Sequence, residues 1–256
     1  MRSGLLAMWL CVLSLTGLAA PTEFGVSCGD ADIPVTRFAA EGSTLIIWLP
    51  SEFGPLAQDL AIAGKLAAQG HEVWIADLYG ARFLPVVASS AEEIPASDVY
   101  QLLRAAARKS KKRLYLLAAG RGAKYALEGA QQWQQGDGKQ RPLAGAVLLY
   151  PNLYAGPPDP GEDPRYLPIA SHTHLHIELL QGDRSPWYWT LDSLQQALAK
   201  RGSRVHIQVL RGVRDRFYFR EGANATERAT GEHLPELISA AINSATRHGK
   251  TQRNKK

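Results

Sequence analysis

Along most of the chain, runs of apolar residues alternate with segments of helical periodicity. The apolar runs are near-continuous in Leu, Ile, Val, Trp and Ala, as strands buried on both faces of a sheet must be. The expected strands are Thr44–Leu49, Glu72–Ala76, Arg113–Ala118, Leu143–Tyr150, His174–Leu180 and Arg204–Leu210. The expected helices are about Leu56–Gln69, Ala96–Lys109, Arg121–Gln132, Trp187–Lys200 and Glu227–Thr246. This alternation predicts an α/β fold with a doubly wound, mostly parallel sheet flanked by helices.

The first twenty residues differ from the rest. Arg2 precedes an apolar run from Leu5 to Leu18, and the small residues of GLAAP follow. This pattern predicts a signal peptide over residues 1–20, cleaved near Ala19 or Ala20. A membrane anchor fits less well, because the run is shorter than the ~20 residues of a spanning helix. We therefore expect a periplasmic or secreted protein without a membrane span, with a single domain over 21–249 and a basic disordered tail over 250–256.

The charge and the cysteine and histidine content limit which partners and ions we expect the protein to bind. The chain has 256 residues and a formal net charge of +5, part of which comes from the terminal RHGKTQRNKK. Such a run is typical of a solvated tail, and we expect no nucleic-acid partner. Cleavage would leave Cys28 as a lone thiol, which is either buried or paired with another chain. His172, His174 and His176 span about 13 Å in an extended chain, too far for one ion, so we expect neither a metal nor a cofactor.

One connection is longer than the others. The stretch PNLYAGPPDPGEDPRYLPIAS, Pro151–Ser171, is rich in Pro, Gly and acidic residues. It leaves the carboxyl end of an expected strand, where ligands bind in open α/β sheets. A loop of this length is either a functional lid or a mobile insertion.

The segment RLYLLAAGRGAKYALEGA turns from an apolar strand into an amphipathic helix at Gly120. In α/β-hydrolases the turn between such a strand and helix is the nucleophile elbow, G-x-S-x-G, with Ser or Cys at its centre. The five positions here are Ala118, Ala119, Gly120, Arg121 and Gly122. The segment resembles the elbow in its frame, while the nucleophile position at Gly120 is vacant.

A longer segment, LIIWLPSEFGPLAQDLAIAGKLAAQGHEVWIADLYGAR, resembles the opening of the dienelactone hydrolase family. In that family an apolar strand runs into an E-x-x-G or E-x-G turn, and a helix and a strand ending in P-D-L-Y follow. The resemblance extends from about Thr44 onward and implies an α/β-hydrolase fold. It also implies a glutamate that contacts the nucleophile and arginines that hold a substrate carboxylate. These positions map to Glu52 in EFG and to Arg82 in DLYGAR.

The other triad positions follow from the same resemblance. LLQGDRSPWY is similar to the family's G-x-D-x-x-x-P, which places the triad acid at Asp183. LRGVRDRFYF is similar to G-x-x-H-x-F, which places Asp215 where the family has its general base His. The acid position is thus retained, whereas nucleophile and base are replaced. A triad without both keeps only the residual catalysis of binding and the oxyanion hole, about 10³–10⁴-fold over water.

The vacant elbow also has properties suited to binding. Gly120 and Gly122 would leave backbone N–H groups uncovered at a helix N-terminus, where the dipole favours an anion. With Arg121 and Arg82 nearby, we expect a pocket for a small carboxylate or phosphate. The alternative is that the glycines only permit a tight turn and the arginines are solvated.

Three functions remain as hypotheses. The leading one is a non-catalytic pseudo-hydrolase that binds a ligand or a partner. The second is an esterase-like or dienelactone-hydrolase-like enzyme that works through replacement residues, with Glu52, Asp183 and Asp215 as its available acids. The third is a periplasmic accessory or assembly protein that acts by surface contact, through the Pro151–Ser171 loop and Cys28.

Overall fold

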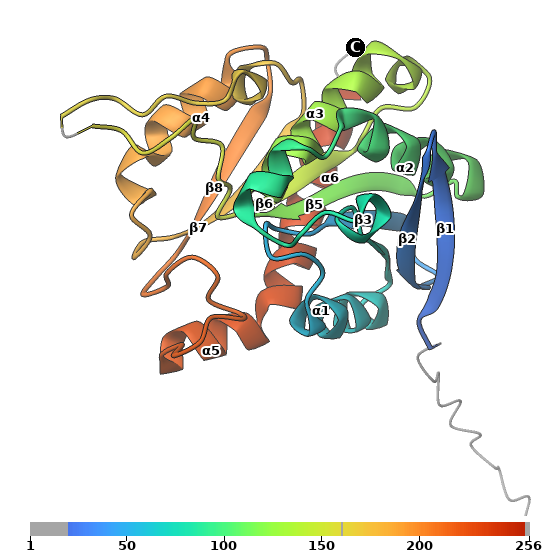
Figure 1. Ribbon diagram of the computed structural model, residues 1–256, viewed down its shortest axis with the longest axis horizontal. Coiled ribbons are helices and arrows are strands. Elements are labelled where there is room, and N and C mark those ends of the chain that lie inside the picture. Colours follow the sequence, from blue (N-terminus) through green and yellow to red (C-terminus); the bar gives the residue numbers. More distant parts are fainter. Residues whose placement is uncertain (1–19, 160, 254–256) are drawn as a thin grey trace, which may run out of the picture.

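The computed structural model describes residues 20–159 and 161–253. Its strands are β1 (Thr22–Cys28), β2 (Ala31–Phe38), β3 (Thr44–Leu49), β4 (His71–Ala76), β5 (Arg113–Ala119), β6 (Gly145–Leu149), β7 (His176–Gly182) and β8 (Arg204–Leu210). They form one eight-stranded sheet in the order β1-β2-β4-β3-β5-β6-β7-β8 (Figure 1). The strands from β3 to β8 run parallel, and β1 and β2 pair antiparallel with their neighbours. The expected doubly wound, mostly parallel sheet is confirmed.

Helices cover both faces of the sheet (Figure 1). They are α1 (Ala57–Ala68), α2 (Ala96–Lys109), α3 (Gly122–Gln135), α4 (Leu191–Ala199), α5 (Ala225–Glu232) and α6 (Leu234–Arg253). Side chains of a strand alternate between faces. Leu45 and Ile47 of β3 therefore pack in one cluster with residues of α2, α3 and α4, while Ile46 and Trp48 pack in the other with residues of α1 and α6.

The last expected helix is two helices. Asn224 caps α5, because its side-chain oxygen accepts a bond of 2.9 Å from the Glu227 N–H, and Glu227 bonds back to the Asn224 N–H at 2.9 Å. Proline lacks the N–H of a helix interior and is tolerated in a first turn. Pro235 accordingly lies at the start of a new helix, α6, which begins at Leu234.

The β1–β2 hairpin was not expected, because the strands predicted from the sequence begin only at Thr44. Gly29, with φ of 61°, and Asp30 form its two-residue turn. Val26 and Cys28 of β1 face the core, and Ser27 between them is exposed. This period-2 alternation around a Gly-Asp pair is the signal that could have predicted the hairpin.

Two expectations fall partly or wholly outside the described residues. The signal peptide expected over residues 1–20 lies there except for Ala20, and the end of the expected tail, residues 254–256, lies there as well. Helix α6 extends to Arg253 and so includes part of that tail. In the described ranges, no helix is long and apolar enough to cross a membrane.

The long loop of residues 151–171 is anchored at both ends. Leu153 and Tyr154 are buried near its start, and Ile169 and Ala170 belong to the core near its end. The Leu167 N–H donates to the Leu153 carbonyl at 2.8 Å, and Tyr154 and Tyr166 form a β-bridge. The loop is therefore packed against the domain at its base, and only the middle portion extends away from it.

Candidate functional site

The elbow has the conformation that its glycines permit. Gly120, with φ of 52°, lies between the end of β5 and the start of α3, and its N–H donates to the Leu149 carbonyl at 3.0 Å. A Cβ on Gly122 would overlap the Pro50 carbonyl oxygen. A left-handed residue at the first position and a close backbone approach at the second both favour glycine. The strand–turn–helix geometry expected around Gly120 is thus present.

The carboxylate of Glu52 fills the space where a nucleophile side chain would start. Glu52 follows β3, and its Oε2 would overlap a Cβ built on Gly120. The same oxygen accepts a hydrogen bond of 2.8 Å from the Arg121 N–H. In α/β-hydrolases the N–H after the nucleophile belongs to the oxyanion hole. The Arg121 N–H at this helix N-terminus is therefore not free for a ligand, because the chain's own carboxylate accepts its hydrogen bond.

A cavity of about 340 Å³ opens beside this carboxylate. It lies at the carboxyl edge of the sheet, and its walls come from the loops that follow β3, β5, β6, β7 and β8. Its lining residues are Glu52, Gly120, Tyr150, Asn152, Arg184, Pro186, Trp187, Arg214, Asp215, Arg216 and Arg220. The structure thus brings Glu52, Gly120 and Asp215 together, as the resemblance implied.

Asp215 lines the cavity, and two hydrogen bonds fix the orientation of its carboxylate. The Gln181 Nε2 donates to its Oδ1 and the Ser185 Oγ donates to its Oδ2, each at 2.9 Å. Burial raises the pKa of the Asp215 carboxyl, although these two hydrogen bonds oppose the shift. The position expected for a general base therefore carries a carboxyl group in a fixed orientation.

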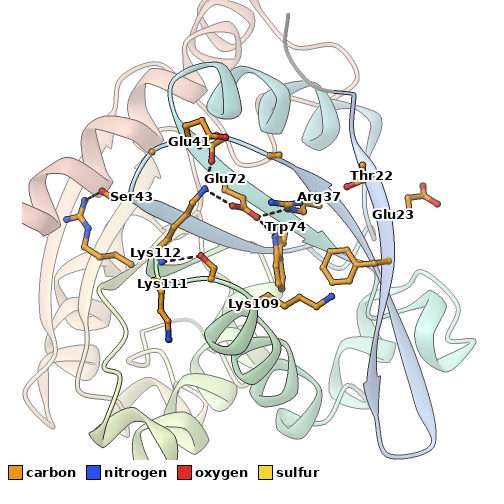
Figure 2. Close-up of a pocket in the computed structure, with 16 residues that line it drawn as sticks. Thr22, Glu23, Arg37, Glu41, Ser43, Glu72, Trp74, Lys109, Lys111 and Lys112 are labelled. Carbon is orange, nitrogen blue, oxygen red and sulfur yellow. Dashed lines mark hydrogen bonds and ion pairs between the residues drawn. The ribbon is translucent and has the colours of Figure 1, made fainter. Parts of the chain in front are cut away.

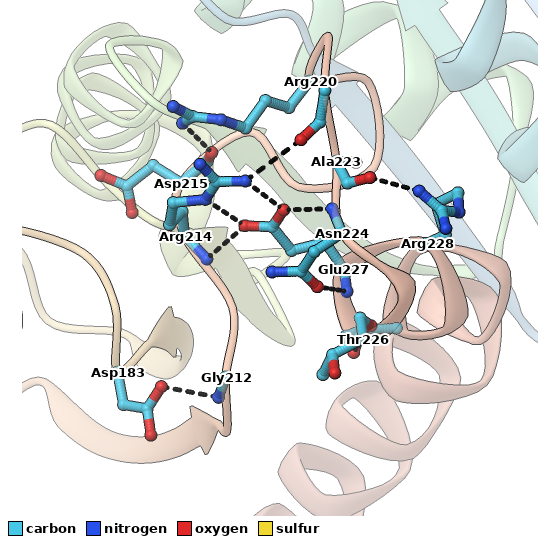
Figure 3. Close-up of polar contacts among 12 residues, drawn as sticks. Asp183, Gly212, Arg214, Asp215, Arg220, Ala223, Asn224, Thr226, Glu227 and Arg228 are labelled. Carbon is cyan, nitrogen blue, oxygen red and sulfur yellow. Dashed lines mark hydrogen bonds and ion pairs between the residues drawn. The ribbon is translucent and has the colours of Figure 1, made fainter.

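Asp183 lies outside this group (Figure 3). Its Oδ1 accepts a bond of 2.7 Å from the Gly212 N–H, and its Oδ2 is 3.6 Å from the Arg211 guanidinium. It does not line the cavity. The retained acid position fastens the end of β8 to the loop after β7, and no hydrogen bond among the described residues joins it to Asp215.

Sequence reasoning missed several residues of this site. Tyr150 and Asn152 line the cavity directly after β6, and their place at a strand end is a signal that could have found them. The Tyr150 hydroxyl donates to the Tyr218 hydroxyl at 3.4 Å, and that of Tyr218 donates to Asp59 at 3.0 Å. Burial raises the pKa of Asp59 to about 6. These buried hydroxyls fix the wall behind the cavity.

The loop after β8 carries three of the cavity's arginines and is anchored by a buried carboxylate (Figure 3). Glu227 is fully buried. Its two oxygens accept bonds of 2.6 Å from the Arg214 guanidinium, and one also accepts a bond of 3.1 Å from the Arg214 N–H. The bonds from Arg214 are the main reason that the pKa of Glu227 falls to about 2. Arg214 therefore stabilises the loop that carries Asp215, Arg216 and Arg220.

We expect the Glu227→Gln variant to lose stability at pH 7 and to lose less at acid pH. A carboxyl whose folded pKa is depressed to about 2 stabilises the native state above its ordinary pKa of about 4.3. That contribution disappears as the pH falls through about 2, so the difference between wild type and variant should shrink across this window. Urea unfolding from pH 7 to pH 2.5 measures it. Glu221→Gln, an exposed change in the same loop, is the control, and an equal pH-independent loss in both variants would contradict the assignment.

Arg82 was expected near the pocket, and the structure places it elsewhere. Its guanidinium bonds the buried Asp98 through Nε at 2.5 Å and through a terminal nitrogen at 2.6 Å. The Cys28 thiol donates to the same carboxylate at 2.9 Å. Burial, followed by this bond, raises the pKa of Cys28 to about 12. Asp98 of α2 therefore holds both Arg82 and Cys28 of β1, and the Cys28 thiol is buried within the domain.

Arg121 also turns away from the cavity. Its Nε donates to Glu92 at 2.8 Å, and one terminal nitrogen donates to the Tyr154 carbonyl at 2.8 Å. Its side chain does not line the cavity. Arg121 contributes its N–H to Glu52 and its guanidinium to the anchoring of the long loop. Arg184, Arg214, Arg216 and Arg220 form the basic rim in its place.

A larger cavity of about 1010 Å³ lies at the amino ends of β3, β4 and β5, beside the hairpin (Figure 2). On its floor the buried Glu72 accepts bonds from Arg37 at 2.7 Å, Lys112 at 2.7 Å and Trp74 at 2.9 Å. Burial raises the pKa of Glu72, but these bonds together leave it below its ordinary value. This carboxylate is matched by partners within the fold, and the cavity contains no part of the elbow.

The three alternating histidines do not converge. His172 contacts the Pro168 carbonyl and His174 the Arg201 carbonyl at 3.3 Å, whereas His176 bonds Glu178 at 3.0 Å. Within residues 20–159 and 161–253, no group of three or more His, Cys, Asp or Glu side chains is arranged to hold a metal ion.

Comparison with solved structures identifies the fold. The chain is similar to the iron-lacking apo form of ESTFA, with a TM-score of 0.68 and 14% identity over 88% of this chain and 85% of that one. It is similar to a protein described as a dienelactone hydrolase from Klebsiella pneumoniae, with a TM-score of 0.65 and 18% identity over 88% and 98%. An esterase from Pyrobaculum calidifontis gives a TM-score of 0.67 and 14% identity over 89% and 85%. No protein-family model and no curated protein sequence matches the chain. The protein has the α/β-hydrolase fold.

Proposed function

We propose that this protein is an exported α/β-hydrolase-fold protein that binds a small carboxylate or phosphate ligand without Ser or Cys catalysis. The observation that carries the proposal is the position of Glu52. Its carboxylate takes the space of the missing nucleophile side chain and bonds the Arg121 N–H. An ester carbonyl in this position would meet a negative charge in place of an attacking group and an oxyanion donor.

The basic rim supports the ligand class. The arginines Arg184, Arg216 and Arg220 line the cavity, and in the described part of the chain none has a carboxylate within 4.0 Å. Guanidinium groups bind carboxylate and phosphate through paired N–H donors. Trp187 adds an apolar wall, held in place by stacking on Tyr154 with 3.9 Å between ring centroids. Open guanidinium groups around a walled cavity favour an anionic ligand over a neutral one.

A panel of organic acids and inorganic phosphate tests the proposal through the thermal stability of the protein. We expect at least one anion to raise the Tm of the wild type and Arg184→Ala to weaken that binding about 10–100-fold, as expected for a charge-assisted hydrogen bond. Arg211→Ala is the matched control, because Arg211 is on a neighbouring loop end, is largely exposed and does not line the cavity. Absence of any stabilising anion, or an equal loss in Arg211→Ala, would refute the proposal.

A second candidate is a hydrolase that uses replacement residues, and Asp215 is the observation in its favour. Its carboxyl faces the cavity and has a raised pKa, the property that a general base requires. Turnover of p-nitrophenyl esters or dienelactone-type lactones by the wild type, lost in Asp215→Asn, would support this candidate. If the protein hydrolyses these substrates no faster than buffer alone but still binds an anion, the hydrolase candidate is excluded and the binding function stands.

A further inference from the structure

The candidate cavity holds both signs of charge in an unusual arrangement. Glu52 and Asp215 contribute two carboxylates, and Arg184, Arg216 and Arg220 contribute three guanidinium groups. Across the described ranges, none of these five groups comes within 4.0 Å of an opposite charge, whereas Arg214 is paired with Glu227. Each of these five charges therefore lacks a partner of opposite charge at ion-pair distance.

Separate contacts within the fold hold four of these five charged groups, Glu52, Asp215, Arg216 and Arg220. Glu52 is held against the elbow by the Arg121 N–H, and this bond uses only its Oε2. Asp215 is clamped by Gln181 and Ser185. Arg216 lies over the Phe53 ring at 5.3 Å, and Arg220 donates to the Asp215 carbonyl at 3.4 Å. In these positions Glu52 and Asp215 stay more than 4.0 Å from the guanidinium groups, although the charges of Arg216 and Arg220 still oppose the rise in the pKa of Asp215.

A simple anion matches only the guanidinium groups of this lining. It would gain contacts with the guanidinium groups, but it would also approach the carboxylates of Glu52 and Asp215, and like charges in a partly desolvated site repel. A ligand that also carries a positive group would match both sets. Such a group has acceptors in Glu52 Oε1, which the Arg121 bond leaves open, and in Asp215.

We propose that the ligand is zwitterionic: a small molecule with an ammonium group directed to Glu52 and Asp215 and a carboxylate or phosphate directed to Arg184 and Arg220. This inference rests on the proposed binding function and narrows its ligand class. The cavity of about 340 Å³ is near the lower end of the range for small-molecule sites, about 300–1,000 Å³, which suits a molecule of amino-acid or dipeptide size. Trp187 and Pro186 limit its width.

Calorimetric titration of the full chain with two matched pairs of small ligands tests the inference. Glutamate and glutarate differ only in an ammonium group, as do phosphoethanolamine and ethyl phosphate, and the two pairs separate carboxylate from phosphate recognition. We expect the zwitterion of at least one pair to bind about tenfold or more tightly than its partner. In Glu52→Gln that ratio should fall at least severalfold, because the amide oxygen can still accept the Arg121 N–H while one of the two carboxylates is gone. Arg184→Ala should weaken both members of the pair by a similar factor.

The outcomes are separable. Equal binding of glutarate and glutamate, and of ethyl phosphate and phosphoethanolamine, would overturn the zwitterion and leave an anion-binding protein. Failure of all four compounds to bind, together with no response to the wider anion panel, would overturn the proposed function itself. If Glu52→Gln does not fold, as judged by circular dichroism, Asp215→Asn carries the same test, since it also removes one negative charge from the cavity.

Discussion

Replacing Asp98 with alanine is expected to destabilise the protein by about 3–5 kcal/mol, the cost of breaking a buried ion pair from one side. Asp98 is fully buried and accepts two hydrogen bonds from Arg82 and one from Cys28. The variant would leave the Arg82 guanidinium without its buried partner. Urea unfolding of the variant and the wild type measures the difference in unfolding free energy. The comparison requires that the free energy depend on urea concentration with the same slope in both proteins.

Asp30→Ala is the matched control for this prediction. Asp30 also faces Arg82, at 3.7 Å, but its side chain is 89% exposed. Exposed ion pairs contribute about 0–1 kcal/mol, so this variant should unfold close to the wild type. Labelling of Cys28 by a thiol reagent, followed on its own peptide, should also accelerate in Asp98→Ala only. Similar stability losses in the two variants would contradict the buried Arg82–Asp98 pair.

Restoring a serine at Gly120 is expected to lower stability by about 2–5 kcal/mol. A left-handed backbone costs a side-chain-bearing residue about 1–2 kcal/mol. Overlap of the new Cβ with Glu52 Oε2 adds about 1–3 kcal/mol, the usual penalty of overpacking. Urea unfolding again measures the loss. The variant would be poorly accommodated because the carboxylate of Glu52 already occupies the space next to Gly120.

Two further variants separate the cost of the left-handed backbone from the cost of the overlap with Glu52. Gly29 has a similar φ of 61° with no atom within 4 Å of an added Cβ, so Gly29→Ser reports the backbone cost alone. Combining Gly120→Ser with Glu52→Ala should bring the cost of the serine down to that of Gly29→Ser. Equal losses for Gly120→Ser and Gly29→Ser in the wild-type background would show that Glu52 does not occupy this position.

Much of the fold follows from local pattern. The strand Thr44–Leu49 has the predicted bounds, because a continuous apolar run between turn residues belongs to a strand buried on two faces. Arg204–Leu210 also has its predicted bounds, although it is the edge strand β8 and is only partly buried. Helix α2 also has its predicted bounds, Ala96–Lys109. The hairpin was missed because its half-exposed strands lack such runs and depend on pairing with β4 for their burial.

The amino-acid sequence by itself determined the order of strands and helices from β3 onward and the strand–turn–helix frame with Gly120 at its centre. These are properties of residues at known distances along one strand–turn–helix unit, so local periodicity and turn chemistry suffice. Only the tertiary structure decided which charges meet. Arg82 and Arg121 follow strands that end at the same edge of the sheet as the site, yet buried Asp98 and nearby Glu92 draw their guanidinium groups away. Glu52 reaches the elbow amide, and Arg220 joins the cavity, because side-chain direction is set by partners distant in sequence, and strand order alone does not contain that information.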